Sequence, residues 1–147
     1  MSMKQLNTLL KFEKDKSDRC AEQLKLAENE YQQNMIRLQG VSDYRLEYMK
    51  RLTQRAEQGL DSATYSHYHA FIAKLDQASA QVDIAMRQAK ALAEQSKGLW
   101  FKQRQKVKAV ELLREKRLKK MNVAEQRAEQ KMFDEIATQQ FVRRNTQ

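Results

Sequence analysis

The sequence contains no proline and only three glycines, Gly40, Gly59 and Gly98, among its 147 residues. Because proline and glycine are the strongest breakers of regular structure, a chain nearly free of both can form long, uninterrupted helices. The remaining residues are mostly Gln, Lys, Glu, Ala, Leu, Arg and Met, which lose little entropy in a helix. So few glycines also exclude a phosphate-binding loop and a dinucleotide-binding turn. We therefore expect an all-α protein that binds no nucleotide by these routes and uses no cofactor.

Cysteine and histidine are scarce as well. The single cysteine, Cys20, excludes an internal disulfide and a cysteine-based zinc site, and we interpret it as a packing residue. The only histidines, His67 and His69, are two positions apart and point to different sides of a helix, so we expect no metal site. The sequence has no signal-peptide run at its start and no apolar stretch of about 18 residues. The sequence also shows no set of residues with the spacing of a catalytic site. Together these absences predict a cytosolic protein that is not an enzyme.

Apolar residues in the first half follow alternating steps of three and four. They predict a seam, the line along which two helices meet, at Cys20, Leu24, Ala27, Tyr31, Asn34, Leu38, Val41, Arg45, Tyr48 and Leu52. This spacing over three or more heptads is typical of a coiled coil. Asn34 and Arg45 are the polar exceptions, and we interpret them as residues that restrict the register at some cost in stability.

The segment from Gln58 to Ala63 is the one strong turn signal. Gly59 can adopt the left-handed conformation that closes a helix, and Asp61 or Ser62 can cap the next helix. The predicted elements are a first helix over residues 4–57, a turn over 58–63 and a second helix over 64–140. The fold class is therefore an antiparallel two-helix coiled-coil hairpin with a longer second helix, in one domain spanning residues 1–147.

The second helix restarts the seam after the turn. Its predicted positions are Tyr68, Ile72, Leu75, Ser79, Val82, Met86, Ala89, Ala93, Ser96, Trp100, Gln103, Val107 and Val110, drifting on through Leu113, Leu118 and Met121. At 1.5 Å per residue this helix is about 115 Å long against about 80 Å for the first.

The length difference predicts an overhang of roughly 20 residues, from about Met121 to Phe141. The overhang still carries large apolar side chains, of which Met132, Phe133 and Ile136 are candidate partner-binding residues. Apolar residues on a helix without a partner in its own chain belong either to a frayed end or to a site for another protein.

Positive charge is concentrated in one stretch. Residues 1–63 carry 11 Lys or Arg against 10 Asp or Glu, whereas residues 97–120 carry ten basic residues and only two acidic ones. The candidate residues for electrostatic contact are Lys102, Arg104, Lys106, Lys108, Arg114, Lys116, Arg117, Lys119 and Lys120. Three interpretations stay open: a solvated helix surface, an acidic protein surface such as the lumen of a ring, and a nucleic acid. The nucleic-acid interpretation is the weakest, because these residues surround the helix and no recognised reading motif accompanies them.

A second apolar stripe follows the turn, at Phe71, Leu75, Ala78 and Val82. Leu75 and Val82 are also seam positions, so core packing explains half of the stripe. Phe71 and Ala78 lie beside the seam and extend it into a wider face. A broad core near the turn and a docking surface are equally compatible with this spacing.

Two distinctive segments flank the turn at Gly59, namely Asp43-Tyr-Arg-Leu-Glu-Tyr48 and Tyr68-His-Ala-Phe-Ile-Ala-Lys-Leu-Asp-Gln-Ala78. Together with the turn, these segments resemble the FliJ family of the flagellar type III protein export apparatus. The resemblance extends over the whole chain through the length, the two-helix layout, the basic second helix and the central Trp100.

Membership would imply an antiparallel coiled coil similar to the central stalk of rotary ATPases. It would also imply that the chain inserts into the hexameric ring of the export ATPase FliI and promotes the assembly and activity of that ring. The further partners it implies are the regulator FliH, the export-gate protein FlhA and substrate chaperones. Peripheral association with the cytoplasmic face of the inner membrane follows from the gate contact. The family's gate-binding positions fall on Phe71, Leu75, Ala78 and Val82, although Val82 stands where a histidine can occur. The basic residues and the overhang would meet the ring.

Two alternatives remain beside this interpretation. The corresponding stalk of a virulence type III secretion system has the same shape, and a basic coiled coil that binds nucleic acid belongs to a different functional class. Steep salt dependence of binding to polyanions distinguishes the second alternative from an adaptor that selects an ATPase ring.

Overall fold

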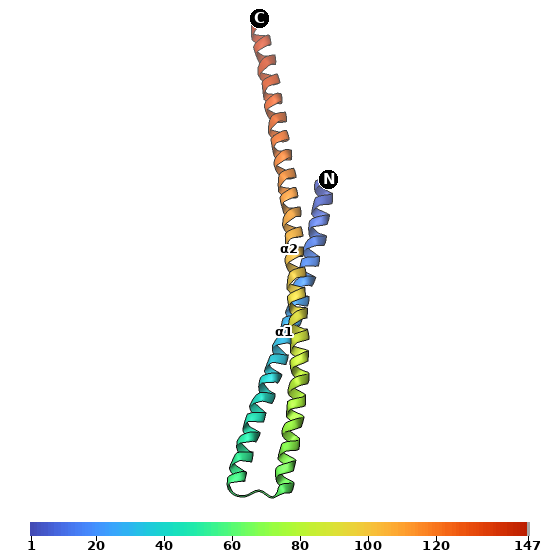
Figure 1. Ribbon diagram of the computed structural model, residues 1–147. Coiled ribbons are helices and arrows are strands. Elements are labelled where there is room, and N and C mark those ends of the chain that lie inside the picture. Colours follow the sequence, from blue (N-terminus) through green and yellow to red (C-terminus); the bar gives the residue numbers. More distant parts are fainter. Residues whose placement is uncertain (147) are drawn as a thin grey trace. The chain divides into compact units, whose positions relative to one another are not determined.

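The chain forms two α helices, α1 (Met3–Glu57) and α2 (Ser62–Asn145), in a computed structural model that describes residues 1–146 (Figure 1). The helices run antiparallel and α2 is the longer, which confirms the predicted hairpin. Helix α2 begins two residues before the predicted start and continues five residues past the predicted end. No proline or glycine follows Gly98 to stop it, so the helix extends almost to the end of the chain.

The connection between the helices has the two features that the sequence predicts. Gly59 has a φ of 92°, in the left-handed region, and its N–H donates to the carbonyl oxygen of Ala56 at 3.2 Å. Asp61 precedes α2 as its N-cap, and its Oδ1 accepts the backbone N–H of Thr64 at 2.9 Å. Hydrogen bonds from Thr64 lower the pKa of Asp61, because they favour the charged carboxylate.

Contacts divide the chain into two compact units. Unit 2 comprises residues 18–101, which include the turn, and unit 1 comprises residues 1–17 together with α2 from residue 102 onward. The single domain expected from the sequence stays a prediction.

The seam of unit 2 lies where the periodicity predicts. Each predicted position from Cys20 to Leu52 and from Tyr68 to Trp100 is buried or half-buried. The two polar positions behave differently. The buried Asn34 donates its amide to the carbonyl oxygen of Glu30 in its own helix at 3.0 Å, whereas Arg45 reaches across to Asp76, with 2.6 Å between Nε and Oδ1. Only Arg45 therefore makes the cross-helix contact expected of a residue that restricts register.

Near the turn, aromatic rings fill the space between the helices of unit 2. The ring centroid of Tyr48 lies 4.5 Å from that of Phe71 and 4.9 Å from that of Tyr68, and Tyr44 lies 6.1 Å from Phe71. The Arg55 guanidinium lies 5.8 Å from the centre of the Tyr68 ring. Rings are larger than the aliphatic residues usual in a seam, and Figure 1 shows α1 and α2 farther apart toward the turn than midway along unit 2.

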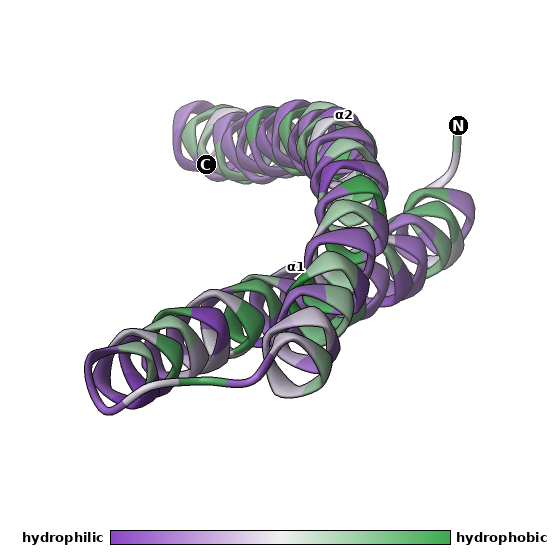
Figure 2. Ribbon diagram, turned by 60° about the horizontal axis from the view of Figure 1, so that its bottom comes forward, coloured by the Kyte–Doolittle hydropathy of each residue, from purple (hydrophilic) through white to green (hydrophobic). Residues whose placement is uncertain are grey.

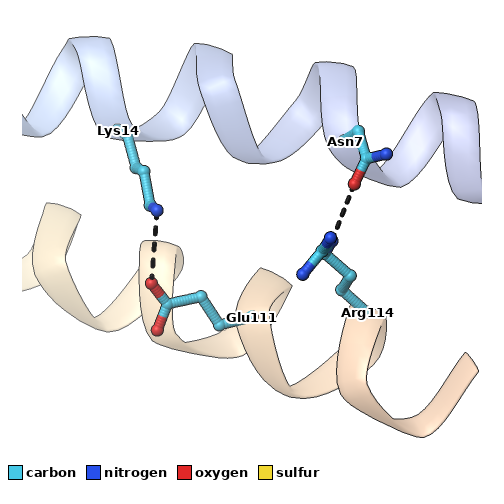
Figure 3. Close-up of polar contacts among 4 residues, drawn as sticks. All are labelled: Asn7, Lys14, Glu111 and Arg114. Carbon is cyan, nitrogen blue, oxygen red and sulfur yellow. Dashed lines mark hydrogen bonds and ion pairs between the residues drawn. The ribbon is translucent and has the colours of Figure 1, made fainter. Parts of the chain in front are cut away.

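Polar contacts join the start of α1 to α2 in unit 1. The buried Gln103 donates its amide to the carbonyl oxygen of Glu13 at 3.1 Å and also to the Glu13 carboxylate. Figure 3 shows two further contacts: Arg114 donates to Asn7 Oδ1 at 2.7 Å, and Lys14 lies 3.9 Å from Glu111. Leu6 and Val110 are the buried apolar residues of this pairing.

The seam ends earlier than predicted. Leu113, Leu118 and Met121 are exposed by 52%, 42% and 45%, so the predicted drift of the seam through them is wrong. Asn7 faces Arg114, and α1 begins at Met3, one turn before Asn7. Every residue from Glu115 to Thr146 is exposed, and this segment, called the overhang from here on, is longer than predicted. Apolar and polar residues alternate along it in Figure 2.

Candidate functional site

The apolar stripe after the turn is half-buried in unit 2. Phe71 packs against Tyr44 and Tyr48 of α1, so its ring belongs to the contact between the helices. Leu75, Ala78 and Val82 are half-buried on α2. The structure thus places all four residues along the edge of the seam, where each offers part of its surface to solvent.

Two tyrosines that sequence reasoning did not assign to this site complete it. Tyr44 is 47% exposed and touches Phe71 edge-on, and Tyr48 stacks near Tyr44 with ring centroids 6.3 Å apart. With Phe71 and Tyr68 they form an aromatic cluster that continues the stripe onto α1. The tyrosines before the turn were the available signal, but only the pairing of the helices shows that they meet Phe71.

The predicted basic residues lie in unit 1, and most are exposed. The exposed ones are Lys102, Arg104, Lys106, Lys108, Lys116, Arg117, Lys119 and Lys120, whereas Arg114 is half-buried by its contact with Asn7. The two acidic residues of the stretch are both paired. Glu111 pairs with Lys14 of α1, and Glu115 with Lys119 at 3.8 Å. The surface of residues 97–120 is strongly positive because ten basic residues outnumber these two acidic ones, and the cation that pairs with Glu111 comes from α1.

The overhang presents its apolar side chains to solvent. Met132, Phe133 and Ile136 are exposed by 54%, 61% and 44%, and Phe141 and Val142 beyond them are exposed as well. Residues 121–146 carry four basic and four acidic side chains, so this part of the overhang has no net charge. A basic segment and a neutral apolar segment thus follow one another along one helix.

Metal-ligand clusters and membrane-spanning helices were both sought in residues 1–146. Within that range, no three His, Cys, Asp or Glu side chains gather into a metal site, and neither helix is long and apolar enough to cross a membrane. His67 and His69 are exposed, and His69 contacts Tyr65 with ring centroids 4.3 Å apart. Cys20 is half-buried in the seam as a free thiol.

Comparison with known protein families identifies the family of the chain. The family model described as Flagellar FliJ protein matches residues 3–146, nearly the entire chain. The chain belongs to the FliJ family. Neither the curated proteins nor the solved structures compared with it gave a match. As a FliJ family member, the chain is a component of the flagellar protein export apparatus.

Proposed function

We propose that this FliJ family protein is a non-catalytic adaptor that binds the export ATPase FliI and the export-gate protein FlhA. In this proposal unit 1 contacts the FliI ring, promotes its assembly and raises its activity. Unit 2 contacts the gate, and through it the protein associates peripherally with the cytoplasmic face of the inner membrane. FliH and substrate chaperones are the further partners expected of the family.

One observation carries the proposal: α2 continues without a partner helix beyond residue 114 and is strongly basic where it leaves α1. An exposed helix with concentrated positive charge attracts an acidic surface over a distance of about 8–10 Å and increases the rate of association. The proposed electrostatic contacts are Lys102, Arg104, Lys106, Lys108, Arg114, Lys116, Arg117, Lys119 and Lys120.

Apolar contact is proposed to follow this electrostatic attraction. Met132, Phe133 and Ile136 are exposed large side chains on the neutral part of the overhang. Burying them against ring subunits would stabilise those subunits that fit the helix best. A single helix inside a ring meets the subunits in different orientations, so it binds their conformations unequally and shifts their populations.

The gate contact is assigned to the stripe of Phe71, Leu75, Ala78 and Val82. These residues are half-buried beside the aromatic cluster and still offer a continuous apolar edge. The support for this assignment is the resemblance of the residues around the turn together with this partial exposure.

The ring contact is tested by measuring ATP turnover of FliI with and without the full chain. The variant Lys102→Glu, Lys106→Glu, Lys108→Glu changes the charge by −6 at exposed positions of unit 1. The control variant Lys25→Glu, Lys50→Glu, Lys90→Glu changes it equally at exposed positions of unit 2. The unit 1 variant is expected to need roughly tenfold more protein for half-maximal stimulation, and the control no more than about twofold. Unchanged turnover at saturating wild-type chain would refute the proposal.

The gate contact is tested by binding to the cytoplasmic part of FlhA. Ala78→Glu places a charged side chain on the stripe, and Ala80→Glu places the same side chain on an exposed position of α2. Ala78→Glu is expected to weaken binding by at least about tenfold, because a carboxylate is desolvated in an apolar contact, while Ala80→Glu binds as wild type does. Equal effects of the two substitutions would remove the stripe from the contact. Circular dichroism of both variants confirms that the helices are retained.

A further inference from the structure

A groove runs along α2 beside the start of α1 in unit 1. Its first part, about 640 Å³, is lined by Met1, Leu6, Leu113, Lys116, Arg117, Lys119 and Lys120. A second hollow of about 300 Å³ shares Lys119 and Lys120 with the first and continues past Val123 and Ala124 to Arg127. The two hollows adjoin at Lys119 and Lys120, and together they are called the cationic groove from here on.

The floor of the cationic groove is apolar. Leu6 is buried in the seam, and Leu113 and Val123, 52% and 45% exposed, lie along the groove with Met1 and Ala124. The floor therefore begins at the contact between the two helices and continues onto the overhang. An apolar surface that continues a helix–helix seam is suited to a further helix.

The rim of the groove carries only one sign of charge. The charged residues that line it are Lys116, Arg117, Lys119, Lys120 and Arg127. Glu115 lies 3.8 Å from Lys119, but both side chains are more than half exposed, and an exposed ion pair of this kind is easily exchanged. An occupant with acidic residues beside an apolar stripe would match both the floor and the rim.

The length of the groove indicates the size of its occupant. The lining residues of α2 run from Leu113 to Arg127. Among them, steps of three and four place five on one face of the helix: Leu113, Lys116, Lys120, Val123 and Arg127. At 1.5 Å per residue this face is about 21 Å long, which corresponds to about four turns of a docked helix.

We propose that the cationic groove binds an acidic amphipathic helix of another protein, with its apolar stripe on the floor and its carboxylates at the rim. The site shares Lys116, Arg117, Lys119 and Lys120 with the proposed ring contact, and to that extent it deepens the proposed function. A nucleic acid fits less well, because the lining contains no aromatic side chain on which a base can stack. A second copy of the chain fits less well because its own positive rim would face this one.

The test uses the full chain without any ring, and a fluorescent peptide as the probe. The peptide has about 18 residues, with leucines in steps of three and four and glutamates on both flanks. The control peptide has the same composition in an order that spreads the leucines around the helix. Fluorescence anisotropy is expected to show binding of the first peptide at least about tenfold tighter than the second. Equal affinity of the two peptides would overturn the proposal, since charge alone would then explain binding.

Matched variants locate the site. Leu113→Asp on the floor is expected to weaken peptide binding at least about tenfold, and Leu112→Asp, at a neighbouring exposed position outside the groove, is expected to leave it unchanged. Replacing both Lys119 and Lys120 with glutamate is expected to weaken peptide binding by a similar factor. The matched control, with Lys25 and Lys50 replaced by glutamate, is expected to bind the peptide as the wild type does.

Two results would overturn the assignment. One is that Leu113→Asp leaves the affinity for the peptide unchanged. The other is that single-stranded DNA displaces the peptide and does so equally well from the wild-type chain and from the Leu113→Asp variant. Because no ATPase is present, a negative result here is distinguishable from failure of the ring contact.

Discussion

Replacing Gly40 and Gly98 with alanine is expected to stabilise the protein, whereas the same replacement at Gly59 is expected to destabilise it. All three glycines belong to unit 2, so their effects on the stability of the same unit can be compared. A Cβ atom added at any of the three meets no heavy atom within 4 Å. Steric clashes with neighbouring side chains therefore do not enter, and the backbone conformation alone decides the sign.

The magnitudes follow from that difference. Gly40 and Gly98 lie inside α1 and α2, where glycine is less favourable than alanine by about 0.8–1.0 kcal/mol. Gly59 has a φ of 92°, and an L-residue in the left-handed region is disfavoured by roughly 1–2 kcal/mol. The two helical variants should thus raise the free energy of unfolding by about 1 kcal/mol each, and Gly59→Ala should lower it by a similar amount or more.

Urea unfolding followed by circular dichroism at 222 nm measures these changes, and thermal unfolding supplements it. For a unit of this size, 1 kcal/mol corresponds to a shift of the thermal midpoint of about 4–8 °C. A double variant at Gly40 and Gly98 should show nearly additive effects if the two sites are independent. The reasoning would be refuted by destabilisation at either helical glycine or by stabilisation at Gly59.

Three further predictions concern unit 2. Asp61→Ala is expected to lower stability near neutral pH by removing the cap of α2. Folding lowers the pKa of Asp61 from about 3.8, so the unfolded state takes up the proton first as the pH falls. The stability that the cap contributes is therefore lost as the pH falls through the lowered pKa. Asp61→Asn, a good cap that does not titrate, serves as the control in acid unfolding curves. Tyr48→Ala should cost at least about 1–3 kcal/mol in urea unfolding, because it removes two close aromatic pairs worth about 0.5–1.5 kcal/mol each, while the exposed Tyr65→Ala should cost less. A double-mutant cycle on Arg45 and Asp76 should give a coupling of roughly 0.2–1 kcal/mol that decreases in 1 M salt, and a coupling unaffected by salt would contradict an exposed ion pair.

Helix positions and seam residues were largely predictable from the sequence. A heptad pattern depends only on which residues recur at steps of three and four, and this local property identified Ala27, Leu52, Ile72, Ala89 and Val110 as core residues before any partner helix was known. The turn was equally predictable from the sequence, because Gly59 and Asp61 act through their own backbone and side-chain geometry.

The candidate sites were predictable only in part. The sequence located the basic residues and the apolar stripe, but it did not show that Phe71 packs against Tyr44 and Tyr48, since that contact joins residues far apart in the chain. Nor did it indicate that Met1 and Leu6 line a groove with Leu113. Groove and cluster alike depend on the register between the helices.

The sequence by itself therefore determined that this protein is two long helices with a turn at Gly59 and a basic second helix, because helix propensity, capping and charge are properties of neighbouring residues. The tertiary structure alone decided where pairing stops. Leu113 and Leu118 continue the apolar pattern, yet both are exposed: α1 begins at Met3, and its Asn7 faces Arg114. Whether an apolar residue becomes core or a surface for a partner is set by what lies opposite it, and that information is absent from the residue's own stretch of sequence.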